Sequence, residues 1–282
     1  MRLATVRSGG EERAALVTQS GVFALEDINR AYGTRWATDI LSLLESGQFY
    51  ELPGWLRGTP GLPGVEALRE VRYGPLYWRP RKIWGIGLNY VEHAGDLSEA
   101  ASSGEPASFM KPDTTVIGPG EAIRLPRQSE RVTGEAELGV VIGREARNVP
   151  EEDALSVVAG FTTVVDMTAE DILQRNPRYL TRAKSFDTFF SFGPEVVTPD
   201  EVGSLEELEV TTALNGEPVR TNAVRNMTFS PLWLVAFHSE VMTLLPGDVI
   251  STGTPGAVII RDGDVVSCRI DGFESLSNPV VR

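Results

Sequence analysis

Three acidic residues have the types and the spacing to bind one divalent cation. Glu135 and Glu137 precede the apolar run Leu138–Ile142, and Asp166 follows a second apolar run, Phe161–Val165. Residues i and i+2 of a strand point to one face, where two carboxylates about 7 Å apart repel each other unless a positive charge lies between them. An acid at the end of the second strand would complete an all-oxygen site suited to Mg²⁺ or Mn²⁺. The alternative interpretation is a solvated strand face.

The chain has only two histidines, which narrows the search for a general base. His93 lies three residues before Asp96, and one helical turn would bring the carboxylate to the imidazole. A carboxylate partner fixes the tautomer and raises the basicity of the ring, as activation of water requires. The alternative is a histidine in a surface loop. His238 lies in the apolar segment Phe229–Leu245, and we expect it to be a packed core histidine.

Two lysines and one turn are candidates for holding an anionic ligand. Lys184 lies among aromatic residues in the segment Arg182–Phe189 and could be a buried cation for a substrate carboxylate. Lys111, within Phe109–Pro112, has the same two interpretations, because an isolated lysine is usually found at the surface. The turn Thr252–Pro255 could direct a hydroxyl and a backbone N–H at a ligand, or it could simply connect two strands.

The elements that must position these residues are mostly strand-like. Apolar patterning predicts strands over Lys82–Ile86, Glu137–Ile142, Gly160–Val165, Leu208–Leu214, Val249–Ser251, Val258–Ile260, Val265–Ile270 and Val280–Val281. Asn215-Gly216 predicts a hairpin turn. Helices are expected over Glu151–Val158, Ala169–Arg175 and Phe229–Leu245. Many short strands with scattered helices predict a β-rich α+β fold with a barrel-like core.

The first 75 residues read as a separate small α/β unit. Strands are expected over Met1–Val6, Ala14–Val17 and Gly21–Leu25, and a short helix over Thr38–Leu44. Proline and glycine then crowd residues 53–64, which predicts a connecting segment. The sequence thus predicts a small N-terminal domain over residues 1–75 and a main domain over residues 76–282.

Composition and charge set the class of protein. Hydrophobic residues make up 41% of the chain and charged residues 23%, as in soluble globular proteins. A formal net charge of −13 argues against nucleic-acid binding, and no apolar run approaches the roughly 20 residues of a membrane span. The single cysteine, Cys268, and the absence of a signal-peptide pattern favour a cytoplasmic location. Because an acidic surface repels anions, a site for a carboxylate substrate must supply its own positive charge.

Taken in order, these segments resemble the fumarylacetoacetate hydrolase family from about Lys82 to Val281. The motifs that carry the resemblance are Gly87-Leu88-Asn89-Tyr90 with His93, Phe109-Met110-Lys111-Pro112, Glu135-Ala136-Glu137-Leu138, Asp166, Lys184-Ser185-Phe186-Asp187-Thr188-Phe189, Asn215-Gly216-Glu217, Pro246-Gly247-Asp248-Val249-Ile250 and Thr252-Gly253-Thr254-Pro255. Each motif alone is weak, but the ordered set is specific. It favours the functional interpretation of His93, Lys184 and the carboxylates. Residues 1–75 resemble the variable N-terminal unit of the family only loosely.

The resemblance implies a β-rich core of mixed sheets rolled around a metal site. It implies one Mg²⁺ or Mn²⁺ ion on the positions of Glu135, Glu137 and Asp166. It also implies that His93, supported by Asp96, activates water on a mobile lid, and that Lys184 meets the keto-acid end of the substrate. The substrate is implied to be a small keto acid, and many relatives are homodimers. The residues implied to contact the substrate are Asn89, Tyr90, Lys111, Arg182 and Thr254.

Two positions depart from the family pattern. The acid after His93 is usually glutamate, and Asp96 is one methylene shorter, so the pair would form only when the lid closes or would not form at all. Relatives often have glycine two residues after the Thr-Pro turn, where this chain has Ala257. The methyl group of an alanine at that place would leave less space beside the backbone on the substrate side.

The activity implied is hydrolysis of a C–C bond in a β-diketo acid, of the acylpyruvate or fumarylpyruvate type, through a metal-bound pyruvate enolate. The cation would stabilise the charge that develops when a bond to C3 breaks. Without an activated water, the same enolate would arise by decarboxylation of oxaloacetate, and reprotonation elsewhere would isomerise a 2-hydroxy-dienoate. A metal-binding protein without turnover is a further alternative. The presence of His93 and Lys184 argues against it, because a pure binder needs no general base.

Overall fold

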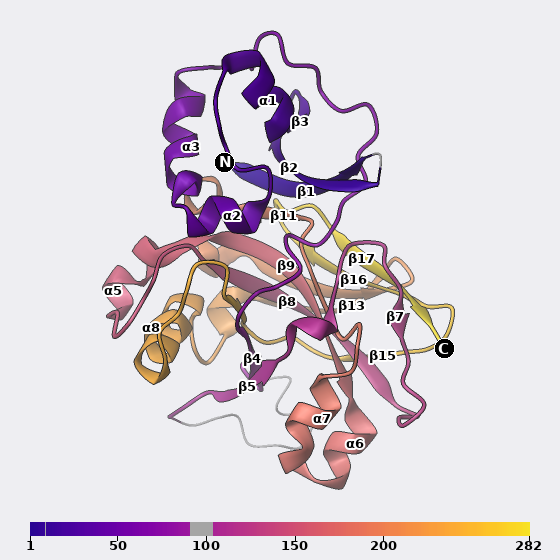
Figure 1. Ribbon diagram of the computed structural model, residues 1–282. Helices are drawn as coiled ribbons and strands as arrows, with labels where there is room; N and C mark the ends of the chain where they lie inside the picture. The colour runs from indigo at the N-terminus through magenta and orange to yellow at the C-terminus, as the bar shows by residue number, and fades with distance from the viewer. Residues whose placement is uncertain (9, 91–103) are drawn as a thin grey trace.

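The core of the protein is formed by two mixed β-sheets, as the computed structural model of residues 1–8, 10–90 and 104–282 shows (Figure 1). The predicted β-rich α+β class is confirmed. Within these residues the two sheets stay open and do not close into a barrel. The larger sheet has the strand order β3 (Gly21–Ala24), β2 (Glu11–Thr18), β1 (Arg2–Ser8), β11 (Glu195–Val197), β9 (Val158–Ala169), β8 (Val132–Ile142), β14 (Val249–Ser251), β4 (Ile83–Gly87) and β5 (Ala107–Lys111).

Three short strands join this sheet beside its main path: β10 (Phe190–Phe192), β6 (Val116–Ile117) and β15 (Val258–Ile260). The second sheet has the order β13 (Glu217–Ala223), β12 (Glu209–Leu214), β16 (Val265–Ile270), β17 (Leu276–Val281) and β7 (Ile123–Arg124). Strands β12 and β13 form the hairpin predicted at Asn215-Gly216. Both turn residues have positive φ, 51° and 89°, as a tight two-residue hairpin requires.

The antiparallel pair of β8 and β9 is the centre of the fold, and every residue in both strands is buried. Both strands extend beyond their predicted ranges. Their register places Glu135 directly opposite Asp166, and pairing continues to Val132 and Ala169. Asp166 therefore lies inside a strand, and its predicted place at a strand end is wrong. The apolar run ended there in the sequence, but the pairing with β8 continues through Met167, Thr168 and Ala169.

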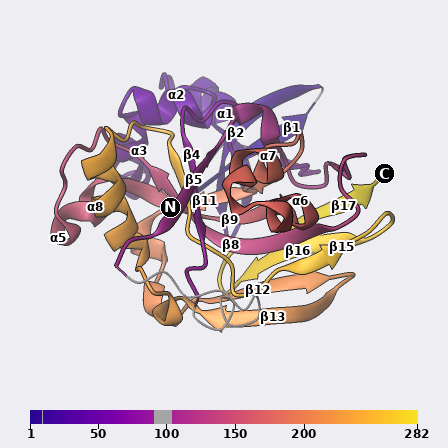
Figure 2. The ribbon, with the colours of Figure 1, turned by 90° about the horizontal axis from the view of Figure 1, so that it is seen from below.

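The two faces of the β8–β9 pair have different neighbours. Ala136, Leu138 and Val165 belong to the core shared with the second sheet. On the opposite face, Val141 and Val164 belong to the core shared with the N-terminal unit, and the acidic residues continue this face. Figure 2 shows helices α6 (Glu170–Arg175) and α7 (Leu180–Lys184) on one side of the pair and strands β12, β13 and β16 on the other.

The N-terminal unit packs on the main sheet through both backbone and side chains. Strand β1 pairs with β11, so strands β1 to β3 extend the larger sheet. Helices α1 (Leu25–Tyr32), α2 (Ile40–Glu45) and α3 (Gln48–Arg57) lie in the upper part of Figure 1. Helix α3 contains Pro53, within the stretch predicted as a connecting segment. Phe49 and Leu52 are buried in the core, and their packing outweighs the local breaking signal.

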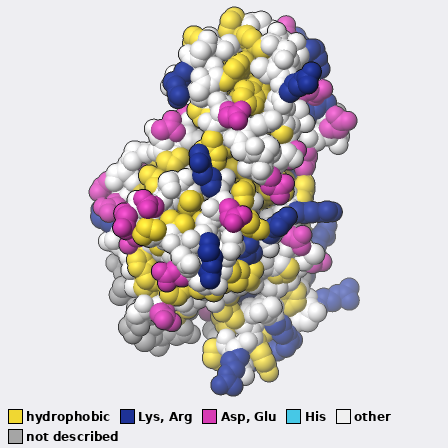
Figure 3. Space-filling model, turned by 60° about the vertical axis from the view of Figure 1, so that its left-hand side comes forward, with side chains coloured by type: hydrophobic (Ala, Val, Ile, Leu, Met, Phe, Trp, Pro, Cys, Tyr) yellow, Lys and Arg dark blue, Asp and Glu magenta, His cyan; other side chains and the backbone are white. Residues whose placement is uncertain are grey.

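The three helices predicted for the main domain are all shorter than expected, and helix α7 was not predicted. Helix α8 spans Pro231–Val241, with Ser230 as an N-cap that accepts a hydrogen bond from the Trp233 N–H. Helix α5 spans only Glu151–Ala154, and after one 3₁₀ turn Val158 already begins β9. On the face drawn in Figure 3, acidic and basic side chains are interspersed. Among the described residues, the helices are all too short or too polar to cross a membrane.

Candidate functional site

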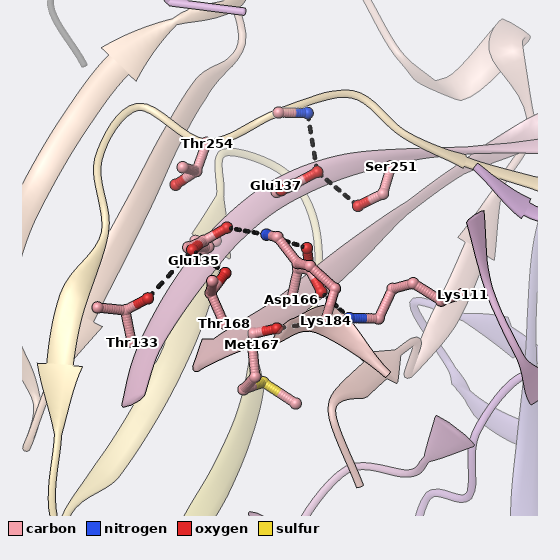
Figure 4. A network of polar contacts seen from close by, with 12 residues as sticks. Lys111, Thr133, Glu135, Glu137, Asp166, Met167, Thr168, Lys184, Ser251 and Thr254 are labelled. Carbon is pink, nitrogen blue, oxygen red and sulfur yellow. Dashed lines mark hydrogen bonds and ion pairs between the residues drawn. The ribbon is translucent and has the colours of Figure 1, made fainter. Parts of the chain in front are cut away.

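Glu135, Glu137 and Asp166 converge on one buried point. Each offers a carboxylate oxygen, and these oxygens all lie within 4.8 Å of one another. Glu135 and Glu137 share one face of β8 because they are two residues apart, and Asp166 reaches the same face through the cross-strand register. Figure 4 shows the three carboxylates turned toward one another. The predicted convergence of these acids is confirmed.

Two buried lysines neutralise most of this negative charge. Lys184 Nζ donates to Glu135 Oε2 and to Asp166 Oδ2, at 2.7 Å each, and lies 4.9 Å from the centre of the Phe109 ring. Lys111 Nζ lies 2.5 Å from Asp166 Oδ1. Lys184 is positioned by α7, while Lys111 ends β5 on the other side of Asp166. Both lysines are therefore buried and are not surface residues, while their contact with a substrate carboxylate stays a prediction.

Glu137 is held by neutral donors instead of a lysine. Its Oε2 accepts hydrogen bonds from the Ser251 hydroxyl at 2.5 Å and from the Gly253 N–H at 2.8 Å. The pairing of β14 with β8 brings Ser251 close to Glu137, and the turn after β14 brings the Gly253 N–H there. The turn beginning at Thr252 thus directs a backbone N–H at a carboxylate of the protein. Gly253 has φ +100°, and a side chain there would collide with Asn89.

The surroundings shift the pKa values of Glu137 and Asp166 in opposite directions. Burial, with Asp166 nearby, raises the pKa of Glu137 to about 8. Burial also acts to raise the pKa of Asp166, but the two ammonium groups outweigh it and hold this pKa below its usual value. Burial acts to lower the pKa of Lys184, but Asp166 and the two glutamates raise it above its usual value. Asp166 is thus a permanent anion and Lys184 a permanent cation, while Glu137 carries a proton at neutral pH.

The residues present fit a divalent cation. Three carboxylates are an all-oxygen donor set of the kind that Mg²⁺ and Mn²⁺ prefer. The three carboxylates and two ammonium groups leave one negative charge when all are ionised. A divalent cation would change the net charge to one positive, which would attract a keto-acid anion. Thr168 and Thr133 both donate to Glu135 Oε1, at 2.6 and 3.1 Å, and fix its orientation.

A cavity of about 240 Å³ opens beside the acids. Glu135 and Lys184 lie at its polar end together with three threonine hydroxyls. Its other walls come from the end of β4, from β5 and from the α6–α7 segment. A larger hollow of about 650 Å³ lies far from these residues, against β2 and the loop after α3. The polar and apolar groups beside the buried charges make the smaller cavity the candidate active site.

The structure places the other predicted site residues in different surroundings. Thr254 lines the cavity, and its hydroxyl contacts the backbone of Gly256. The Asn89 amide is fully used by the backbone of Thr252 and Phe229, so it holds the turn in place. Tyr90 is buried in the hydrophobic core and is not among the residues that line the cavity. Arg182 is exposed, with its guanidinium over the Tyr179 ring.

Both predicted members of the general-base pair, His93 and Asp96, lie outside the described residues, as does most of the lid expected over Gly95–Ser108. The last two residues of that range, Ala107 and Ser108, begin strand β5. The roles of His93 and Asp96 remain predictions from the sequence. His238 is the core histidine that its apolar helix predicted. Its Nδ1–H donates to the Leu234 carbonyl oxygen at 2.7 Å, and its Nε2 accepts from the Ser108 hydroxyl at 2.8 Å. Burial lowers the pKa of His238, so the ring stays neutral in the core.

Sequence reasoning missed the hydroxyl residues that support the acids. Thr133 and Thr168 hold Glu135, and Ser251 holds Glu137. Thr133 carried a usable signal, because it precedes Glu135 by two residues and must share its face. Ser251 carried none, because it is 114 residues from Glu137 and meets it only through the pairing of β14 with β8.

Binding of a divalent cation is expected to release about one proton per chain at pH 7. Glu137 carries that proton in the ion-free protein, and a carboxylate must lose it to become a ligand. The apparent affinity should therefore fall about tenfold per pH unit below pH 8 and level off above it. Calorimetric titration with Mn²⁺ in buffers of different ionisation enthalpy measures the proton release. A release that is equal at pH 6.5 and pH 9.5 would contradict the assignment.

The fold and site define a member of a known enzyme family. Residues 82–281 match the family described as fumarylacetoacetate (FAA) hydrolase C-terminal, which covers more than half of the chain. The chain belongs to the fumarylacetoacetate hydrolase family. The resemblance carried by its sequence motifs is thereby confirmed.

Relatives within the family have several activities. The mitochondrial oxaloacetate tautomerase A of Homo sapiens is 37% identical over 221 residues, covering 75% of this chain and 70% of that protein. The 2-hydroxyhepta-2,4-diene-1,7-dioate isomerase of Mycobacterium marinum is 31% identical, with a TM-score of 0.76, over 100% of this chain and 98% of that chain. The maleylpyruvate hydrolase of Sphingobium sp. SYK-6, solved with manganese(II) and pyruvate, is 29% identical, with a TM-score of 0.81, over 100% and 99% of the two chains.

Proposed function

We propose that the protein is a metal-dependent hydrolase that cleaves acylpyruvates into pyruvate and a carboxylic acid. One observation carries the proposal: three buried carboxylates and two buried lysines lie together, and two of them, Glu135 and Lys184, line a small cavity. The whole-chain likeness to a hydrolase solved with manganese and pyruvate supports it. Mg²⁺ or Mn²⁺ is the expected ion because all the donors are oxygens.

Glu135, Glu137 and Asp166 would hold the ion, which would supply a Lewis acid for the charge that develops on the keto oxygen. Lys184 places a second positive charge at the polar end of the cavity, where it attracts and orients the carboxylate of the pyruvoyl group. Lys111 fixes Asp166 from the far side. Thr133 and Thr168 keep Glu135 from turning away.

The reaction adds one water across the bond between C3 and the distal acyl carbonyl carbon. His93, oriented by Asp96, would take a proton from that water, and hydroxide would add to the distal carbonyl. The bond to C3 then breaks, its electron pair forms the pyruvate enolate, and a proton returns to C3. The products are pyruvate and the acid of the acyl group, so the atoms of substrate and water are all accounted for.

A second candidate function needs no water. The sequence identity with oxaloacetate tautomerase and the structural likeness to a dienoate isomerase favour a proton transfer between the enol and keto forms of a 2-oxo acid. Decarboxylation of oxaloacetate belongs to the same group, because it also leaves an enolate at C3. These reactions would use the same carboxylates and Lys184 but would not require His93 as a base for water.

Product analysis separates the candidates. The Mg²⁺-loaded protein is incubated with acetylpyruvate, with the enol form of oxaloacetate and with a 2-hydroxy-dienoate, and products are followed by NMR. We expect stoichiometric pyruvate and acetate from acetylpyruvate. Rapid conversion of enol oxaloacetate, with acetylpyruvate left unchanged, would replace the hydrolase proposal with the second candidate.

A further inference from the structure

The cavity beside the acids has two chemically different ends. Its polar end contains Glu135 and Lys184, with the hydroxyls of Thr133, Thr168 and Thr254. The rest of its lining is almost entirely hydrocarbon. The apolar side chains that form this part come from two segments of the chain: Leu88 and Phe109 belong to the region of β4 and β5, and Leu173, Pro177 and Leu180 to the α6–α7 segment.

Among the described residues that line the cavity, positive charge is found only at the polar end. Among the described side chains that line the cavity, Lys184 is the cation, and it already contacts Glu135 and Asp166. The other charged group away from the metal site is the carboxylate of Glu170, which is paired with Arg131. Arg182, which sequence motifs suggested as a substrate contact, is exposed and does not line the cavity. Of the side chains that the structure describes there, a second carboxylate would meet hydrocarbon and one acid.

Leu88, which lines the apolar part of the cavity, has a strained backbone conformation. Its φ is 58°, a left-handed conformation that is unfavourable for a bulky residue and is adopted more readily by glycine or asparagine. The strain is placed directly after β4, where the chain turns to enter the buried residues Asn89 and Tyr90. Leucine at this position puts an aliphatic side chain on the cavity wall. Strained residues of this kind concentrate at ligand sites.

We propose that the far end of the substrate is a short, uncharged hydrocarbon group. This inference rests on the proposed function for the position of the keto-acid end. It assigns the protein to acylpyruvates with an aliphatic acyl group and excludes those with a terminal carboxylate, such as a maleyl or fumaryl group. The volume of 240 Å³ corresponds to about eight water molecules, so the group is small.

Two ligands of equal size test this inference without any turnover. They are 5-methyl-2-oxohexanoate and 2-oxoglutarate, in which a terminal isopropyl group and a terminal carboxylate occupy the same place on the same chain. Binding to the Mg²⁺-loaded protein is measured by calorimetry. We expect the isopropyl compound to bind at least about 30-fold more tightly, because a carboxylate buried against hydrocarbon loses its water without gaining a partner.

A positive charge introduced into the wall should weaken this preference. Leu180 is only partly buried, so Leu180→Arg can place a guanidinium at the apolar end. We expect this variant to reduce the dissociation constant of 2-oxoglutarate, divided by that of the isopropyl compound, at least tenfold. Thr181→Arg is the matched control, because Thr181 is exposed on the same helix and does not line the cavity. Leu88→Asn, which suits the left-handed backbone, provides a second wall variant if Leu180→Arg does not fold.

The outcomes separate this inference from the proposed function. Equal or tighter binding of 2-oxoglutarate by the unmodified protein would overturn the inference, even if acetylpyruvate is cleaved. An unchanged ratio in both wall variants would also overturn it. The inference is supported if the unmodified protein prefers the isopropyl compound, and if this preference is weaker in a wall variant but unchanged in Thr181→Arg. Failure to cleave any acylpyruvate would remove the hydrolase proposal while leaving the measured preference in place.

Discussion

Replacing Glu137 by glutamine is expected to abolish turnover and weaken binding of the divalent cation at least 100-fold. The change removes one of three anionic ligands without altering the size of the side chain. The amide oxygen can still accept from the Ser251 hydroxyl and the Gly253 N–H, so the local backbone should be retained. Activity is measured as pyruvate formed from acetylpyruvate, and affinity by Mn²⁺ titration of chelator-treated protein.

The same variant should be more stable than the ion-free parent protein at alkaline pH. The pKa of Glu137 is raised in the folded state, so its contribution to stability is present in acid and is lost as pH rises to about 8. The loss is about 1.4 kcal/mol per pH unit while the folded chain keeps a proton that the unfolded chain has lost. Glutamine does not titrate. The difference in Tm, measured in chelator, should therefore grow between pH 5 and pH 8 and then level off.

If Glu137→Gln binds the cation more weakly and has a higher Tm at alkaline pH, then Glu137 contributes to metal binding and destabilises the ion-free fold when it is ionised. Equal Tm values for the two proteins at pH 5 and at pH 8.5 would contradict the buried-acid assignment. Full activity of the variant in the presence of chelator would contradict the metal assignment.

Replacing His93 by alanine should lower acylpyruvate cleavage by roughly 10² to 10⁴-fold, the usual contribution of a positioned general base. Decarboxylation of oxaloacetate by the same variant should be far less affected, because it requires the cation and Lys184 but no activated water. Single-turnover rates on both substrates at saturating Mg²⁺ give the comparison.

Asp96→Asn is the graded control for this experiment. Asparagine can still orient the imidazole weakly but cannot stabilise its charged form, so cleavage should fall by a smaller factor than in His93→Ala. Equal losses on the two substrates in His93→Ala would mean that His93 positions ligand instead of activating water. The hydrolase proposal would then have lost its base, and the reactions that need no water would replace it.

Local periodicity was enough to predict part of this site. The two-residue spacing of Glu135 and Glu137 placed them on one face of a strand, because side chains alternate along any strand. The apolar run before Asp166 predicted a second strand, and the structure pairs the two. The register between them is a long-range property, so the sequence did not reveal that Asp166 lies opposite Glu135 inside the strand. The charged Asp166 also hid the true length of β9, which continues to Ala169.

Arg182 and Lys184 on α7, and Asn89 after β4, show what the sequence motifs did not predict. Arg182 and Lys184 are two residues apart on α7, and residues at that spacing point in different directions around a helix. One is buried among the acids while the other is exposed. Asn89 lies close to the site, but its amide is used by the backbone that it holds. A motif can thus indicate the neighbourhood of a site without indicating which side chains face the ligand.

Titration of the chelator-treated protein with Mn²⁺ tests the central claim most directly. Free Mn²⁺ is followed by electron paramagnetic resonance, and pyruvate formation from acetylpyruvate is measured in the same samples. We expect both signals to saturate together at one ion per chain, and neither binding nor activity to appear in Glu137→Gln at the same ion concentrations. Pyruvate formation without bound ion, or unchanged binding in Glu137→Gln, would contradict a catalytic metal site at Glu135, Glu137 and Asp166.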